Sequence, residues 1–268
     1  MNNDTNSTAQ KAWLATSTGL VLEGRSCGAT GTAEGELTFN TSMSGYQEIV
    51  THPGAAGQVL IFTMPEIGNY GVNANDVSSD KLQTAAVVAR TICDTPSNWT
   101  CEGSLPDYLA DNAVVAIDQV DTRMLTKAVR DADGPVTAIV TTEEKSAEEL
   151  VAAARAVSIT PAYIETEALA AELGATLTKM PVGNRANNIP VKDLRDGKLY
   201  ITAQHHGYSI DFDGVEGVEV THINLNDKTV EGFAVPAKGI EATLFASLEL
   251  RDLNPAVPQK SSAAPTAL

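Results

Sequence analysis

Few residues of the 268-residue chain could act as covalent nucleophiles, and the strongest candidates by type are its three cysteines. Nucleophilic catalysis needs a base within hydrogen-bond reach of the thiol, and many hydrolases expose the nucleophile on a glycine-flanked strand-to-helix turn. Cys27 lies among glycine turns, Cys93 follows an apolar run and Cys101 lies in a predicted loop, so none occupies such a turn. We expect three inert thiols, with Cys93 buried as a small hydrophobic side chain.

A histidine pair, His205 and His206, is the second candidate for chemistry, because imidazole titrates near neutral pH. The pair lies in Gln204–Tyr208, directly after a predicted strand at Leu199–Ala203, and segments of this kind often carry functional groups. Consecutive residues of an extended chain point to opposite faces, so the two rings cannot chelate one metal ion. An acid–base role and a structural role are both open, and no Cys and His spacing predicts a metal site.

Two polar segments could also approach a ligand. Asn40–Glu48 follows a strand and contains serines and a glycine, and Ile67–Asn73 is rich in glycine and asparagine. For the first segment, the composition favours the alternative of a plain turn packed by Met43 and Tyr46.

The charge balance restricts the possible partners. Lysine and arginine number 18 and aspartate and glutamate 34, which gives a formal net charge of −16. A surface this negative repels phosphate backbones and anionic lipid heads, so we predict binding to neither nucleic acid nor a membrane. The N-terminal sequence has no leader pattern and the chain has no long apolar run, which predicts a cytoplasmic protein.

Apolar runs and turn residues predict a strand-rich first domain over residues 12–158, a second domain over 165–253 and a disordered tail over 254–268. Helices are predicted at Asp121–Arg130, after the capping box that begins at Ser146, and from a cap at Thr166 to Leu173. Gly174 is the predicted C-cap of the last helix. The predicted strands include Leu20–Leu22, Glu36–Phe39, Val59–Met64, Thr84–Ala89, Ala113–Ile117, Pro135–Val140, Leu199–Ala203, Val218–Ile223 and Val230–Val235.

Several segments match a known family almost verbatim and in order. They are Phe39–Ile49, Ile67–Asn73, Pro96–Trp99 and Asp121–Thr126, and more weakly Gly174–Thr176, Gly183–Val191, Gln204–Tyr208 and Thr221–Leu225. On these motifs the chain resembles the small, glutamine-hydrolysing subunit of carbamoyl-phosphate synthase. The resemblance implies an α/β fold, in which a β-rich N-terminal domain that packs on the large subunit precedes a truncated class I glutamine amidotransferase-like α/β domain.

The resemblance also implies a function. In that family the amidotransferase domain hydrolyses glutamine through a cysteine thioester, and the large subunit combines the ammonia with bicarbonate and ATP. The product, carbamoyl phosphate, serves pyrimidine and arginine biosynthesis. The implied partner is therefore the large subunit, to which ATP and magnesium would belong, with no cofactor in this chain. The implied glutamine contacts are His205, Gly207 and Tyr208.

The chain departs from the family pattern where the catalytic residues belong. The Gly-Ile-Cys-Leu-Gly-His-Gln segment that carries the nucleophile is absent, because the chain passes from Pro161 almost directly to Ala168–Gly174. Leu244–Glu249 replaces the His-Pro-Glu segment, and Gly54 replaces a serine that contacts glutamine. We therefore predict no catalytic residue, although the chain could still belong to an enzyme.

Three functions are open at this point. The chain could be a non-catalytic homologue that docks on the large subunit or regulates it. It could be an active glutaminase, which would require one of the three cysteines to be the nucleophile. It could also be a deletion remnant whose second domain exposes apolar strands such as Leu199–Ala203 and aggregates.

Overall fold

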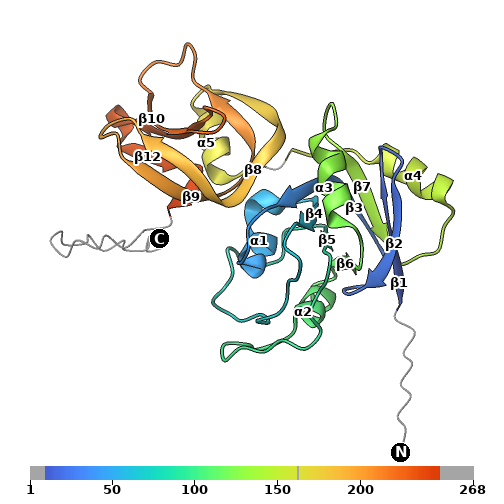
Figure 1. Ribbon diagram of the computed structural model, residues 1–268. Helices are drawn as coiled ribbons and strands as arrows, with labels where there is room; N and C mark the ends of the chain where they lie inside the picture. Colours follow the sequence, from blue (N-terminus) through green and yellow to red (C-terminus); the bar gives the residue numbers. More distant parts are fainter. Residues whose placement is uncertain (1–9, 162, 248–268) are drawn as a thin grey trace, which may run out of the picture.

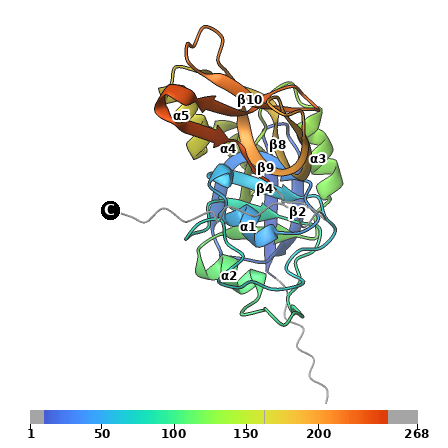
Figure 2. The same cartoon turned by 90° about the vertical axis from the view of Figure 1, so that its left-hand side faces the viewer.

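A computed structural model describes residues 10–161 and 163–247 of the chain. It is an α/β structure with two groups of elements, as predicted (Figures 1 and 2). We call residues 11–156 the first unit, 157–161 the linker and 163–247 the second unit. The end of the second predicted domain, 248–253, and the predicted disordered tail over 254–268 lie outside the described residues.

The first unit contains seven strands, four α-helices and one short 3-10 helix, η1. These are β1 (Lys11–Thr16), β2 (Val21–Ser26), β3 (Thr32–Asn40), α1 (Tyr46–Thr51), η1 (Pro53–Ala55), β4 (Gln58–Phe62), β5 (Ala86–Val88), α2 (Leu105–Asp111), β6 (Val115–Asp118), α3 (Thr122–Arg130), β7 (Thr137–Thr141) and α4 (Ala147–Ala156). None of the helices described over 10–161 and 163–247 is long and apolar enough to span a membrane.

The strands of the first unit close into a barrel in the order β1-β2-β6-β5-β4-β3-β7. The pairings from β3 through β4 and β5 to β6 are parallel, and the others are antiparallel. All five residues of β4 are buried because the barrel covers one face of this strand and helices cover the other. Closure leaves the barrel without a free strand edge.

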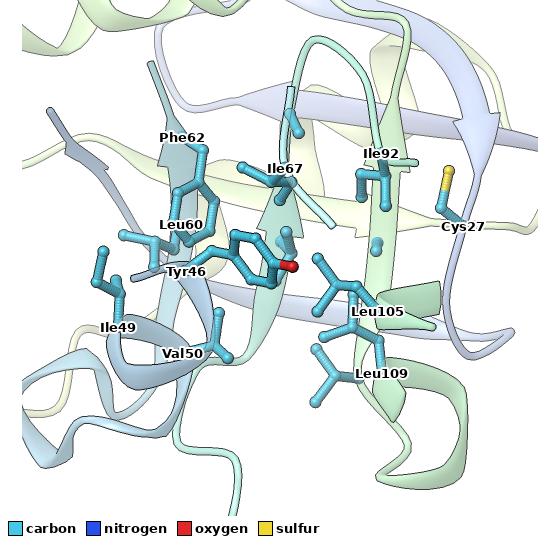
Figure 3. Close-up of a cluster of buried hydrophobic side chains, with 14 of the residues drawn as sticks. Cys27, Tyr46, Ile49, Val50, Leu60, Phe62, Ile67, Ile92, Leu105 and Leu109 are labelled. Carbon is cyan, nitrogen blue, oxygen red and sulfur yellow. The ribbon is translucent and has the colours of Figure 1, made fainter. Parts of the chain in front are cut away.

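Alternate residues of β4 contribute to two hydrophobic cores. Val59 and Ile61 belong to the core with inward-facing residues of the other barrel strands, whereas Leu60 and Phe62 pack with α1 and α2. Figure 3 shows this second core, in which Tyr46 of α1 lies between the strands and α2. The Tyr46 hydroxyl donates a buried hydrogen bond to the carbonyl oxygen of Gly71 (2.6 Å), so the motif segments Asn40–Glu48 and Ile67–Asn73 pack together.

The second unit is a six-stranded antiparallel sheet with one α-helix packed on it. The strand order is β12-β11-β10-β8-β9-β13. Its elements are α5 (Glu165–Glu172), β8 (Thr176–Asp193), β9 (Leu199–Asp211), β10 (Glu219–Asn224), β11 (Val230–Val235), η2 (Pro236–Lys238), β12 (Ile240–Thr243) and β13 (Phe245–Ser247). The apolar core beneath α5 is small, and Phe233 is its largest fully buried side chain.

The helix boundaries follow the predicted signals with one exception. The side chains of Asp121 and Ser146 cap α3 and α4 as predicted, and the Gly174 backbone has a φ of +98° at the end of α5. Thr166, however, is not a cap. The N-cap of α5 is Ile164, because the Glu167 carboxylate accepts the Ile164 N–H (2.9 Å).

Several other local predictions were wrong. Helix α1 occupies the end of the segment predicted as a polar turn, and Met43 does not pack there because its side chain is 71% exposed. Cys93 is only half-buried. The segment Gln204–Tyr208 lies within β9 and not in a loop after a strand.

A buried ion pair joins β2 to β6, where only two residue pairs are in register. The Asp118 side chain is fully buried and accepts hydrogen bonds from Arg25 Nε (2.9 Å), Arg25 Nη2 (2.7 Å) and the Ile92 N–H (2.9 Å). Burial alone would raise the pKa of Asp118, but these hydrogen bonds outweigh it and hold the pKa below its usual value.

The Asp118→Asn substitution should lower the free energy of unfolding by about 3 kcal/mol, because it leaves Arg25 without its buried partner. The matched control is Lys11→Met, which removes an exposed ion pair with Glu23 and should cost less than about 1 kcal/mol. Urea unfolding of both variants tests this. If both variants lost the same amount of unfolding free energy, this result would contradict the structural role of the Arg25–Asp118 pair.

Candidate functional site

A large cavity with a volume of about 800 Å³ lies between the two units. Figures 1 and 2 show β9 running past α1, and β9 also contacts η1. The first unit contributes residues around α1 and η1, and the second unit contributes the start of α5 and parts of β8 and β9. The ionisable residues that line the cavity are Glu48, His52, Tyr70, Asp76, Glu165 and His205.

His52 and His205 bring two imidazole rings together in this cavity, with ring centroids 5.1 Å apart. The Ser42 N–H donates to Asn40 Oδ1 (2.8 Å), which turns the Asn40 amide nitrogen toward His205 Nδ1 (3.3 Å). His205 Nδ1 is therefore an acceptor, and the neutral ring carries its proton on Nε2. That Nε2 atom is buried and has no hydrogen-bond partner among the described residues.

His52 has the same tautomer, because its Nδ1 accepts the Gly54 N–H (3.0 Å). Burial lowers the pKa of His52 and lowers the pKa of His205 well below its usual value. Both rings are thus neutral at pH 7 and offer Nε2–H groups as hydrogen-bond donors.

Glu48 lies on α1 and lines the same cavity as these rings. The helix starts at Gly45, whose φ of +78° is accessible to glycine and whose N–H donates to the Tyr70 hydroxyl (2.9 Å). Glu48 Oε2 is buried without a hydrogen-bond partner among the described residues, and burial raises the pKa of the Glu48 carboxyl group. Asn187 of β8 also lines this side of the cavity.

The lining includes three carboxyl groups and no lysine or arginine among the described residues. It can therefore hold a ligand with a cationic nitrogen near the carboxylates and a hydrogen-bond acceptor near the imidazoles. It contains no cysteine. A covalent thioester therefore cannot form on this lining.

The three cysteines all belong to the first unit. Cys27 packs at the edge of the core in Figure 3, and burial strongly raises the pKa of its thiol. Cys93 and Cys101 are half-buried. A neutral thiol is a poor nucleophile, so the environment of Cys27 is that of a structural residue.

The predicted glutamine contacts do not gather around one cavity. His205 lines the large cavity, whereas Gly207 and Tyr208 line a second cavity of about 170 Å³ between the units. Glutamine contact by these three residues therefore stays a prediction. The sequence indicated the segments Asn40–Glu48 and Ile67–Asn73 as able to approach a ligand, and both contribute to the lining, with Glu48 and Tyr70 among their residues. It did not indicate His52, because both units are needed to form the cavity.

Gly54 of η1 lies in the chain between His52 and Pro53, which line the large cavity, and Ala56 and Gly57, which line the small one. A Cβ atom at this position would overlap the carbonyl oxygen of His205, so the two backbones approach more closely than any residue with a side chain allows. This is also the position where the family pattern has a serine. The glycine thus permits the contact between η1 and β9.

His206 points away from the large cavity into the second unit, as the alternation of an extended chain predicts. Its Nδ1 lies 3.8 Å from Glu167 Oε1 and its Nε2 3.3 Å from Glu231 Oε2, and all three side chains are fully buried. Burial would lower the pKa of His206, but the carboxylates outweigh this effect and raise it. His206 Nδ1 also lies 3.1 Å from the Tyr208 carbonyl oxygen and Nε2 lies 3.3 Å from Gln204 Oε1. Since these oxygens only accept hydrogen bonds, both ring nitrogens carry protons and His206 is a structural cation of the second unit.

Comparisons with known proteins give a consistent result for both units. Residues 14–140 match the model described as carbamoyl-phosphate synthase small chain, CPSase domain, and residues 166–244 match glutamine amidotransferase class-I. A carbamoyl phosphate synthase small chain from Nitratidesulfovibrio vulgaris (strain DSM 19637 / Miyazaki F) is 31% identical, with 87% of this chain and 92% of the relative covered. The small chain from Akkermansia muciniphila is 32% identical, with 84% and 88% covered, and that from Aquifex aeolicus is 30% identical, with 82% and 89% covered.

The alignment with the Nitratidesulfovibrio protein spans 345 positions, more than the 268 residues of this chain. Part of the relative's sequence therefore has no counterpart here.

The Gly54→Ala substitution should lower the free energy of unfolding by about 1–3 kcal/mol, because its Cβ forces η1 and β9 apart. Gly134→Ala is the matched control, since a Cβ at Gly134 meets open space. Urea unfolding measures both variants, and a Gly54→Ala protein as stable as the Gly134→Ala control would rule out the close contact.

His52 and His205 should titrate below pH 6.5, and His206 above it. Since the folded pKa values of His52 and His205 are lowered, the unfolded chain binds protons first, and these residues reduce stability as the pH falls below 6.5. The measurement is an NMR pH titration of the imidazole nitrogens, with His52→Gln and His205→Gln variants for assignment. Titration of His205 above pH 6.5 would contradict the proposed tautomer and environment.

Proposed function

The chain belongs to the carbamoyl-phosphate synthase small-chain family, and from this premise we propose that it docks on a large chain of that synthase without itself hydrolysing glutamine. The observation that carries the proposal is the cavity between the units, whose described lining contains acid, amide and imidazole groups but no thiol. The whole thioester route depends on that one group.

Two further observations support the absence of hydrolysis. No cysteine follows Cys101 in the sequence, so the second unit cannot supply a nucleophile of this type. The alignment that is longer than the chain agrees with the predicted loss of the segment that carries the nucleophile in the family. The carboxyl and imidazole groups of the cavity have no thiol to activate.

Docking is supported by the first unit, which matches the small-chain model over 14–140. Two of its motifs expose large apolar side chains: Trp99 is 94% exposed and Met43 is 71% exposed. Burial of such side chains is favourable, and tryptophan and methionine are enriched at interfaces between proteins. We infer that these side chains contact the large chain.

In this proposal the large chain binds ATP and magnesium and uses free ammonia to make carbamoyl phosphate. The complex would work in the cytoplasm and supply pyrimidine and arginine biosynthesis. The small chain would contribute assembly or regulation of the large chain and would need no cofactor of its own.

The test is co-expression with the large chain of the same organism, followed by size-exclusion chromatography and carbamoyl phosphate assays with glutamine or ammonium as the nitrogen source. We expect co-elution, activity with ammonium and no activity with glutamine above that of the large chain alone. Trp99→Ala should weaken the complex at least about tenfold, as expected for an interface tryptophan. Leu199→Ala is the control, because Leu199 is 65% exposed but lies in the second unit.

Glutamine-dependent activity that is lost on changing one cysteine to serine would overturn the absence of hydrolysis. Failure of the two chains to co-elute would overturn docking and favour a deletion remnant.

A further inference from the structure

A second site is indicated by Arg185, a buried cation with no side-chain hydrogen bond or ion pair among the described residues. Arg185 lies in β8 and is 6% exposed. Its Nε has no hydrogen-bond partner, and among residues 10–161 and 163–247 no carboxylate forms an ion pair with its guanidinium group. Arginine stays charged in proteins, and leaving an unpaired charge buried is costly.

The surrounding backbone makes space for this guanidinium group. A Cβ at Gly183 would overlap Arg185 Nη1, and a Cβ at Gly207 would lie 3.0 Å from Nη2. The cation therefore occupies a slot between β8 and β9 that two glycines leave open. The Arg185 carbonyl oxygen is held in turn by the Thr41 N–H of the first unit (3.2 Å).

The slot opens into the 170 Å³ cavity between the units. Besides Arg185, the lining includes Lys179, Gly207 and Tyr208 of the second unit, Glu36 of the first unit and Ser158 of the linker. At ~30 Å³ for each water molecule, this volume suits a small polyatomic ion with a few waters and is too small for a nucleotide.

The nearby carboxylates are already engaged. Glu36 Oε2 lies 2.7 Å from Lys179 Nζ. The two oxygens of Glu167 accept the N–H groups of Tyr208 (3.1 Å) and Ile164 (2.9 Å). Glu34, which also lines the cavity, is exposed to solvent. Arg185 is thus left without a carboxylate of its own among the described residues, and it lines this cavity together with a smaller pocket of about 10 Å³ next to Gly183.

We propose that Arg185 binds a small oxyanion, either a carboxylate or an inorganic ion such as phosphate or bicarbonate, in the cavity between the two units and the linker. The planar guanidinium group matches two oxygens of such an ion. Because both units and the linker line the cavity, the bound ion stabilises their arrangement. This inference does not depend on docking or on glutamine.

The test measures the thermal unfolding of the full chain at constant ionic strength while sodium chloride is replaced by phosphate, bicarbonate or acetate. We expect a saturable rise of the melting temperature with at least one oxyanion, and the comparison distinguishes inorganic ions from carboxylates. Arg185→Met should weaken the binding by more than about tenfold, since hydrogen bonds to charged groups are lost. Lys238→Met, a change at an exposed lysine outside the cavity, is the control.

Glu36→Gln is a second variant, for which we expect the opposite change in affinity for the oxyanion. It removes a negative charge from the cavity and releases Lys179, so the oxyanion should bind more tightly than to the unmodified chain. If Arg185→Met does not fold, Arg185→Lys and Glu36→Gln provide the comparison, with weaker and tighter binding expected. No saturable stabilisation of the unmodified chain, full binding in the Arg185 variants, or unchanged affinity in Glu36→Gln would each overturn the proposal.

Discussion

The close approach of Gly54 to the carbonyl oxygen of His205 determines how the two units meet. Only glycine fits at this contact, because a side chain would overlap the backbone of β9. The contact places the centre of β9 against η1, whose flanking residues line the two cavities between the units. Neighbouring residues of one strand therefore serve different sites: His205 lines the large cavity, and Gly207 and Tyr208 line the small one.

The interior of the second unit contains buried charged and polar side chains as well as apolar ones, because the unit is small. It is too small to bury a large apolar core, and its interior contains the fully buried group of His206, Glu167 and Glu231. Charges of both signs compensate each other there, whereas Arg185 lacks a protein partner among the described residues. The difference between these two buried cations is the physical reason to expect a ligand at one and a structural role at the other.

The sequence predicted β4, α3 and α4 of the first unit because their signals are local, but it did not predict β1, α1 or α2. The continuous apolar run of β4, the Asp121 cap and the capping box at Ser146 each determine their element within a few residues. Strand β8 was missed because it contains Pro181, Gly183 and Pro190, and its extended form comes from pairing with β9. The family motifs led to the correct family. The segments Asn40–Glu48 and Gln204–Tyr208 were predicted as candidates, but His52 and Arg185 were not, since these two residues acquire their surroundings only when the two units meet.

We propose that this small-chain homologue forms no covalent intermediate with glutamine. The most direct measurement is intact-mass spectrometry of the chain, bound to its large chain, after incubation with a glutamine analogue that alkylates nucleophilic thiols. We expect an unchanged mass, because none of the three cysteines lines the cavity between the units. A single stoichiometric adduct on Cys27, Cys93 or Cys101 that excess glutamine prevents would contradict it.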